Sequence, residues 1–443
     1  MHIPIGTYGN SYSTHNELVI DSFNHTFVDG VSGVGKSTLL EDVAIQNIRA
    51  GRPLLYIDPH GTSARRILGY VPKRYSSRVI YINPLAKKVP GISIFCGKTK
   101  EEKELDIASL SAILKSTAGD AWGFETANVI DSAATAAVES IEHPTMAHVY
   151  LFIVRKLIRE RMIAAADNPL LADFATEYDD GLRSSERMAK FAPPINKLKP
   201  FVRPIIRTIF NQTSSLPLVD LMNDAIMIVD LDKGKIGDMN AALIGSAILN
   251  HVGIYAFRRP AVRRRELTIM VDEFQTFSHG INWTTFFAEL RKYDIRCWLA
   301  TQSITQVPEK WIDSILGNVN NLICFAVGDK DAERIAAAYG DAALASSLIW
   351  LDDHEFHAKV KIGRQRHLFR YVRALPLLSR QGDESRYRDV LKTSRMRWGK
   401  NRRDVDTGIV KLLRHGLENE KSRAANGRTT PEKSSGWGAL ISN

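Results

Sequence analysis

The chain has 443 residues, 44% of them hydrophobic, and a formal net charge of +10. A chain of this length can bury a large core and suits two or three domains, while the positive charge suits an anionic partner. Its three cysteines are too isolated for a disulfide framework or a zinc site, and without an apolar run of about eighteen residues or a signal peptide we expect a cytoplasmic protein with no membrane span.

Seven short apolar runs, each ending in turn residues, predict buried β-strands. Uninterrupted apolar strands are typical of a parallel sheet that helices cover on both faces. The runs span residues 26–30, 53–61, 78–84, 225–231, 267–273, 295–302 and 322–327. The sequence therefore predicts an α/β core.

Between residues 100 and 215 the apolar residues recur at helical spacing instead, which predicts an all-helical insertion into the core. Prolines at positions 193, 194, 200 and 204 predict short, broken helices that lead back to the sheet. From residue 380 onward the chain is polar and carries 15 Lys and Arg against 8 Asp and Glu. We expect its last twenty residues to be disordered.

The stretch VDGVSGVGKSTLL, residues 28–40, matches the phosphate-binding pattern G-x-x-x-x-G-K-[ST] between an apolar strand and an amphipathic helix. The loop N–H groups can face a polyphosphate, Lys36 supplies positive charge, and Ser37 can ligate Mg²⁺. The predicted nucleotide-binding residues are Gly30, Ser32, Gly33, Val34, Gly35, Lys36, Ser37 and Thr38. Asp29 is unusual at the end of a buried strand, and pairing with a basic neighbour would accommodate it.

An acidic pair follows the apolar residues of the run at 267–273. We predict that Asp272 belongs to the metal site and that Glu273 is the general base. Gln302 ends another run, where its side-chain amide can touch the γ-phosphate or the attacking water. Because parallel strands end at one edge of a sheet, we expect Asp58, Asp272 and Gln302 to lie beside the glycine-rich loop.

Three basic features leave their partner open. Arg291 ends a predicted helix, where a guanidinium can reach outward, but spacing alone favours a cation that the helix dipole stabilises. The cluster RRPAVRRRE (258–266) precedes a strand, so we expect a solvated loop on the edge opposite the nucleotide. The segment RMRWGKNRR (395–403) mixes arginines with Trp398, as single-strand binders do, but attraction to any polyanion or to an anionic lipid surface fits equally.

The blocks HTFVDGVSGVGKSTLL, LLYIDPHG, VDEFQTF, RKYDIRCWLATQS and GNVNNLICFAVGDKDAERIA resemble those of the type IV secretion coupling proteins, the TraD/TraG-like conjugation ATPases of the FtsK–HerA superfamily. The likeness runs in order from about residue 20 to about residue 375. It implies a RecA-like P-loop NTPase domain that works as a ring, usually a hexamer, around DNA. Residue by residue it implies phosphate-loop roles for Lys36 and Ser37, metal-binding and catalytic roles for Asp272 and Glu273, a sensor role for Gln302, and an arginine finger at Arg291 that serves the neighbouring subunit.

The expected domains follow this resemblance. Residues 1–99 are the first part of the RecA-like domain with its P-loop at 30–37, residues 100–215 are the helical insertion, residues 216–378 are the second part with the Walker B strand at 267–273, and residues 379–443 are a basic, partly disordered tail. Two features depart from the family. The chain lacks the transmembrane helices of the membrane-bound members, and Ala326 stands where the family often has arginine.

The predicted function is an ATP-hydrolysing DNA translocase of the coupling kind, with ATP and Mg²⁺ as ligands. DNA, further copies of the chain in a hexamer, a relaxase and secretion-channel proteins are the predicted partners, with recruitment to the inner face of the membrane as an option. The alternative is a nucleotide-dependent assembly or docking ATPase that moves no DNA. A non-hydrolysing scaffold is disfavoured because the lysine, serine and both acids are present.

Overall fold

A computed structural model describes residues 2–9, 16–21, 24–118, 122–213, 216, 221–256, 258–259, 261–280, 283–376 and 382–426 of the chain. The chain divides into two compact units. Unit 1 joins Met1–Asn83 to Pro217–Trp398, and unit 2 joins Pro84–Leu216 to Gly399–Asn443. The disorder expected at the end of the chain falls mainly on residues 427–443, which lie outside the described residues.

Unit 1 contains an eleven-stranded sheet. Seven strands are parallel and coincide with the seven predicted apolar runs: β3 (Thr26–Asp29), β4 (Leu54–Asp58), β5 (Val79–Ile82), β7 (Ile226–Asp230), β8 (Leu267–Val271), β9 (Ile295–Thr301) and β10 (Asn321–Cys324). Four antiparallel strands extend the sheet beyond β10: β1 (His2–Tyr8), β2 (Asn16–Asp21), β11 (Glu355–Ile362) and β12 (Gln365–Ala374). The order across the sheet is β2-β1-β12-β11-β10-β3-β9-β8-β4-β7-β5.

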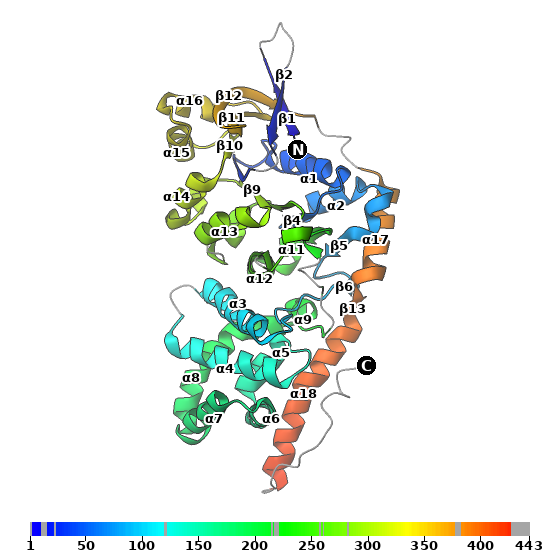
Figure 1. The fold of residues 1–443 in the computed structure, drawn as a ribbon, viewed down its shortest axis with the longest axis vertical. Coiled ribbons are helices and arrows are strands. Elements are labelled where there is room, and N and C mark those ends of the chain that lie inside the picture. The colour runs from blue at the N-terminus through cyan, green and yellow to red at the C-terminus, as the bar shows by residue number, and fades with distance from the viewer. Residues whose placement is uncertain are drawn as a thin grey trace. The chain divides into compact units, whose positions relative to one another are not determined.

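Helices follow most of the parallel strands. They are α1 (Lys36–Arg49), α2 (Thr62–Gly69), α11 (Lys233–Ile236), α12 (Asp238–Ala256), α13 (Trp283–Leu290), α14 (Glu309–Asn318), α15 (Asp329–Tyr339), α16 (Ala345–Ile349) and α17 (Glu384–Trp398). Residues of α1, α2 and α17 form one core cluster with the sheet, and Figure 1 shows these helices near one another. The arrangement is a mixed α/β fold with a mostly parallel sheet.

Both faces of the parallel strands are buried. Tyr56 of β4 belongs to the core cluster with α1 and α2, whereas the next residue, Ile57, points to the opposite face, and both are 0% exposed. Aromatic contacts from Phe27 of β3 to Phe274 and from Phe274 to Trp283 lie on that second face. Because neither face meets water, these strands read as unbroken apolar runs in the sequence.

Helix α17 differs from the tail that the sequence predicts after residue 379. Figure 1 shows it in orange beside α2 and β5, and its Val390 and Leu391 are buried in the core. The hydroxyl of Ser394 accepts a hydrogen bond of 2.9 Å from the N–H of Tyr81 in the edge strand β5. The helix therefore protects the sheet edge, although its exposed basic residues make the segment look like a solvated tail.

Unit 2 is mainly helical. Its helices are α3 (Lys100–Ala118), α4 (Phe124–Ser140), α5 (Met146–Val154), α6 (Lys156–Ala166), α7 (Pro169–Ala175), α8 (Ser184–Leu198), α9 (Pro204–Phe210) and α18 (Arg402–Asn426), and β6 (Lys88–Val89) pairs with β13 (Lys400–Asn401). Helix α8 continues through Pro193 and Pro194, so the helical path is interrupted later than predicted. The interruptions lie at Pro200 and Pro204, which stand at the start of the next two helical segments. Unit 2 starts at Pro84, before the expected boundary at residue 100, and it also includes the segment from Gly399 onward. Among the helices that the structure describes, none has both the length and the apolar character needed to span a membrane.

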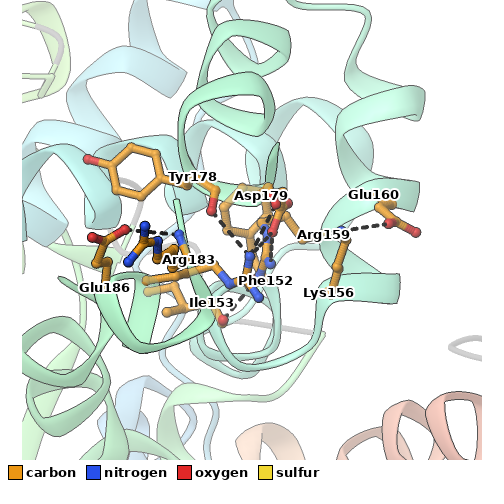
Figure 2. A network of polar contacts seen from close by, with 10 residues as sticks. Phe152, Ile153, Lys156, Arg159, Glu160, Tyr178, Asp179, Arg183 and Glu186 are labelled. Carbon is orange, nitrogen blue, oxygen red and sulfur yellow. Dashed lines mark hydrogen bonds and ion pairs between the residues drawn. The ribbon is translucent and has the colours of Figure 1, made fainter. Parts of the chain in front are cut away.

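A buried ion pair joins α6 to the turn after α7 in unit 2 (Figure 2). Arg159 of α6 makes two hydrogen bonds to the carboxylate of Asp179, at 2.5 and 2.9 Å, and the two side chains are only 2% and 5% exposed. The same guanidinium donates to the carbonyl oxygens of Phe152 and Ile153, at 2.8 and 3.1 Å, near the end of α5. It therefore satisfies carbonyl groups that the helix leaves without a partner.

Candidate functional site

The predicted phosphate loop joins β3 to α1, and its shape depends on glycine. Gly30 has φ of +158°, and a Cβ atom there would lie 2.8 Å from the Cβ of Phe325. Gly35, directly before α1, has φ of +115°, and a Cβ there would lie 2.6 Å from Nδ1 of His354. Any other residue at either position is strained and clashes with its neighbour. The glycines of the pattern are therefore required by the backbone.

Backbone hydrogen bonds anchor this loop on both sides. The N–H of Val31 donates to the carbonyl of Ala326 at 2.8 Å, and the carbonyl of Val34 accepts from the N–H of His354 at 2.9 Å. Between these anchors the loop opens at the N-terminus of α1, whose first N–H groups have no intrahelical acceptor. Such a terminus, with the positive end of the helix dipole, favours an anion.

The other predicted contact residues surround this opening. Ser32 and Gly33 are exposed, Thr38 is half-buried in the first turn of α1, and Lys36 is buried. The Lys36 ammonium donates to the carbonyl of Val31 at 2.7 Å, so it bends over the loop. Burial lowers the pKa of Lys36, and nearby carboxylates, foremost that of Asp272, oppose this shift. The charge of the lysine is thus directed at the loop.

Ser37 and Asp272 meet although they stand 235 positions apart in the chain. The Ser37 hydroxyl donates to Oδ2 of Asp272 at 2.7 Å. Asp272 follows β8 and is 3% exposed, and its burial raises its pKa while the bond from Ser37 opposes the rise. A hydroxyl and a carboxylate beside a phosphate-binding helix terminus form the oxygen set that Mg²⁺ takes in P-loop proteins. The residues present therefore fit a magnesium ion.

Glu273 is held in place from three sides. Its φ of +46° lies in the left-handed region, which costs a residue other than glycine about 1–3 kcal/mol. Its N–H donates a hydrogen bond to Oδ1 of Asp272 at 3.0 Å. Its carboxylate accepts from Nζ of Lys233 and lies against Nε2 of His60, both at 3.1 Å, and it accepts from the amide of Gln302. The structure thus brings Glu273 and Gln302 into direct contact.

The electrostatic setting keeps Glu273 charged. Burial raises the pKa of its carboxyl group, but His60, Lys233 and Gln302 together outweigh burial and hold the pKa below its usual value. We assigned no role to His60 or Lys233 from the sequence. Both follow parallel strands, His60 after β4 and Lys233 after β7, so their place at the shared carboxyl edge was the signal that could have identified them.

Asp58 lies on the same edge but serves the backbone. Its two carboxylate oxygens accept from the N–H groups of His60 and Ala64, each at 2.8 Å. These bonds shape the turn after β4 and satisfy an N–H group in the first turn of α2. Asp58 therefore uses both carboxylate oxygens to support the edge of the sheet.

Asp29 does not find the basic partner that the sequence suggested. It is 0% exposed, and its Oδ1 accepts from the N–H of Gly30 at 2.9 Å. Burial raises the pKa of Asp29 to about 8, helped by the carboxylate of Asp331 on α15 and opposed by the Gly30 N–H, by Lys36 and by the N–H of Ile304. A protonated carboxyl explains how the group is accommodated without an ion pair.

Comparison with known proteins supports the same fold. Residues 266–368 match the family model described as the TraM recognition site of TraD and TraG. The unbound conjugative coupling protein TrwBdeltaN70 superposes with a TM-score of 0.62 at 15% identity, over 81% of this chain and 86% of its own. TrwB in complex with ADP and Mg²⁺ gives 0.61 at 15% identity, over 81% and 88%, and VirB4 of Thermoanaerobacter pseudethanolicus gives 0.51 at 15% identity, over 82% and 94%. No curated protein matches the chain.

The chain resembles a type IV coupling protein of the TraD/TraG kind. The fold that it shares with coupling proteins is a mixed α/β P-loop NTPase fold with a large, mostly parallel sheet, so the predicted fold class is confirmed. The segment that matches the family model runs from the start of β8 into β12. It therefore includes both acids of the candidate site, Gln302 and Arg291.

Arg291 lies at the amino edge of the parallel strands, opposite the carboxyl edge that holds the candidate site. It is exposed and precedes β9, whereas Gln302 follows β9. Seven strand residues span roughly 23 Å, which a guanidinium side chain cannot cross. Arg291 is therefore not brought to the Glu273 site of its own chain.

The arginine cluster at 258–266 lies at the same amino edge, as expected, but it is more than a solvated loop. Arg259 is 2% exposed and donates to Oδ1 of Asn223 at 2.9 Å and to the carbonyl of Tyr293 at 2.8 Å. Arg265 donates to Asp224 at 2.8 Å. These contacts give the cluster a structural role among the described loops of this edge.

Proposed function

We propose that the chain hydrolyses ATP at the site between the phosphate loop and β8, and that it uses the hydrolysis to move DNA as a coupling ATPase of the TraD/TraG kind. The observation that carries the proposal is the 2.7 Å contact from Ser37 to Asp272, with Glu273 beside it. TrwB structures hold ADP with Mg²⁺, the ATP analogue ADPNP and the GTP analogue GDPNP, which supports a purine nucleotide with Mg²⁺ at this site.

The residues divide the work by their chemistry. The loop N–H groups and Lys36 hold the phosphates, and Ser37 and Asp272 hold Mg²⁺, which when bound neutralises charge on the phosphate oxygens. Glu273 accepts the proton of the attacking water, because its carboxylate stays ionised and it directly follows Asp272 at the end of β8. Gln302 orients that carboxylate through the hydrogen bond between their side chains.

We further propose that the active sites are shared between subunits of a ring, which we expect to be a hexamer. Arg291 is exposed and too far from the site of its own chain, so it can act as an arginine finger only in a neighbouring copy. Positive side chains that line such a ring would contact DNA phosphates without reading sequence, and binding would weaken steeply with salt. A finger delivered in this way is worth about 10³ to 10⁵ in rate.

The partners in this proposal are DNA and the proteins of a DNA-transfer machine. The description of the family model that matches residues 266–368, a TraM recognition site, supports a protein of the DNA-processing complex as one partner. The same description also suits the second candidate, a nucleotide-dependent docking ATPase that recruits proteins and moves no DNA. Recruitment of a cytoplasmic protein to the inner face of the membrane would accompany either function.

The test is the rate of ATP hydrolysis against protein concentration, with and without single- and double-stranded DNA at low salt. We expect the rate per subunit to rise with both, because shared sites form only when subunits assemble on DNA. A rate per subunit that responds to neither contradicts the translocase. A rate that rises with concentration but ignores DNA favours the docking ATPase.

Two variants assign the chemistry in the same assay. Lys36→Ala should abolish ATP binding, while Glu273→Gln should bind ATP but hydrolyse it about 10² to 10⁴ times more slowly. Lys73→Ala, at an exposed position before β5, serves as the control variant. Unchanged turnover in Glu273→Gln removes that residue from its proposed role.

A further inference from the structure

The segment before β11 runs beside the phosphate loop and is attached to it. The carbonyl of Leu348 accepts from the N–H of Val327 at 3.2 Å, and the carbonyl of Ala326, one residue earlier, accepts from the N–H of Val31 in the loop at 2.8 Å. The end of α16 and the start of the phosphate loop are therefore joined through the same two residues after β10.

His354 attaches the other end of the segment to the loop. Its N–H donates to the carbonyl of Val34 at 2.9 Å, and its own carbonyl accepts from the N–H of Ala374 at 2.8 Å. With φ of +66°, His354 holds a left-handed conformation that is costly for a residue with a side chain. Strain held from both sides is typical of sites where the backbone must keep a fixed position for function.

Trp350 lies between these two attachments and is 82% exposed. A single exposed aromatic residue is common and needs no explanation by itself. Trp350 differs because the residues that bracket it, Leu348 and His354, are both tied to the phosphate loop or to its immediate neighbours. The backbone that carries this broad apolar ring is thus attached on both sides to the phosphate loop or to its neighbours.

The charges around the segment indicate which end of a nucleotide it suits. Asp352 and Asp353 follow Trp350 and are exposed, so their carboxylates repel phosphate groups. The phosphates are drawn instead to Lys36 and the N-terminus of α1. The uncharged base is left for the tryptophan, whose flat face suits stacking.

We propose that Trp350 is the platform on which the base of the bound nucleotide stacks. This inference rests on the proposed function, since it assumes that the loop binds nucleotide phosphates. Stacking on an aromatic ring accepts any base, because every base has a π-face. The platform therefore makes the chain bind a nucleotide more tightly than a polyphosphate that lacks a base. It discriminates only weakly between adenine and guanine.

The test compares the affinities of ADP and inorganic pyrophosphate, both with Mg²⁺, for the wild-type chain and its variants. Loss of one base–aromatic stack corresponds to roughly 5- to 150-fold in affinity. We expect Trp350→Ala to weaken ADP binding by at least fivefold and leave pyrophosphate binding unchanged, and Trp350→Phe to restore most of the ADP affinity. Phe124→Ala, which removes a 90% exposed aromatic residue from unit 2, should change neither affinity.

Equal ADP affinity in the wild type and in Trp350→Ala overturns the inference but leaves the proposed function standing. The same holds if Trp350→Ala changes subunit assembly while its ADP affinity stays equal to that of the wild type. If the wild type binds neither ligand, the proposed function fails and the inference falls with it. Fluorescence gives a second measurement that does not need the alanine variant to fold. ADP, but not pyrophosphate, should quench the wild-type tryptophan emission. Trp350→Phe should lose this quench while its ADP affinity stays within about threefold of the wild-type value. A quench that persists in Trp350→Phe contradicts the platform.

Discussion

Asp29 shows how one buried carboxyl group can make stability depend on pH. The folded chain keeps its proton up to pH values near 8, whereas the unfolded chain loses it near the ordinary value of 3.8. Between these values the unfolded state binds fewer protons than the folded state, so the contribution of this group to the free energy of unfolding falls as pH rises. Asp331, Lys36, Cys324 and Tyr339 are the titratable neighbours that face it.

Asp29→Asn should remove this dependence. We expect its stability relative to the wild type to increase between about pH 4 and pH 8, by at most about 1.4 kcal/mol per pH unit, and to level off above pH 8. Thermal unfolding of both proteins across this range measures the difference. Asp313→Asn, at an exposed position, should track the wild type, and a pH-independent gap between Asp29→Asn and wild type would contradict the assignment.

At the residue scale, the sequence predicted what a local pattern encodes. The lysine and serine of the loop and the acids after β8 stand in fixed positions of known motifs, and Gln302 stands at the end of an obvious strand. Lys233 and His60 were not predicted as partners of Glu273, because their contact depends on which strands are neighbours in space. The pKa of Asp29 also escaped prediction, since burial and the approach of Asp331 come from the tertiary fold.

The buried pair in unit 2 makes a prediction at the scale of helices. Arg159→Met or Asp179→Leu alone should each lower the free energy of unfolding, by up to about 3–5 kcal/mol, because each removes the bidentate partner of a buried charge and leaves Asp179 only the more distant Arg187, at 4.0 Å. The double variant should cost less than the sum of the two. Chemical unfolding monitored by helical circular dichroism measures these changes.

A second ion pair on α6 is the matched control. Lys156 and Glu160 are 3.9 Å apart and about half exposed, and Figure 2 shows both pairs together. Removing this pair should change the free energy of unfolding by less than about 1 kcal/mol. Equal effects of the two pairs would mean that burial does not decide the contribution of Arg159 and Asp179.

At the scale of elements, burial decided what the sequence could predict. The seven strands buried on both faces were read directly from their apolar runs. The hairpin of β11 and β12 was not predicted from the sequence, because most of β12 is exposed and carries polar residues. Helix α17 was missed for the same reason, since only Val390, Leu391 and Ser394 are buried in it.

The division of the chain makes a prediction at the scale of the whole molecule. Helix α18 packs on α5, α6 and α9 within unit 2, with Ile409 buried and Asp406 paired with Arg207 at 2.6 Å. Deleting residues 84–216 alone should leave this helix without its partners and yield an aggregating protein. Deleting residues 399–443 as well should yield a monodisperse unit 1 that still binds pyrophosphate.

Size-exclusion chromatography and pyrophosphate titration distinguish these outcomes. The wild type and a variant shortened after residue 426 serve as controls, since the latter keeps all of α18. Comparable aggregation of both deletion variants would mean that unit 1 does not fold without unit 2.

The return of the chain to both units has a consequence for biosynthesis. On the ribosome, β5 of unit 1 lacks the helix that covers it until α17 emerges, and unit 2 lacks α18 until residues 402–426 are translated. Unit 1 cannot finish folding until the first part of unit 2 has been made, and unit 2 cannot finish until unit 1 is complete, so the nascent polypeptide exposes apolar surface of both units until α17 emerges. Termination before α17 should therefore give chaperone-bound products in which neither unit has matured, whereas termination between α17 and α18 should leave only unit 2 unfinished.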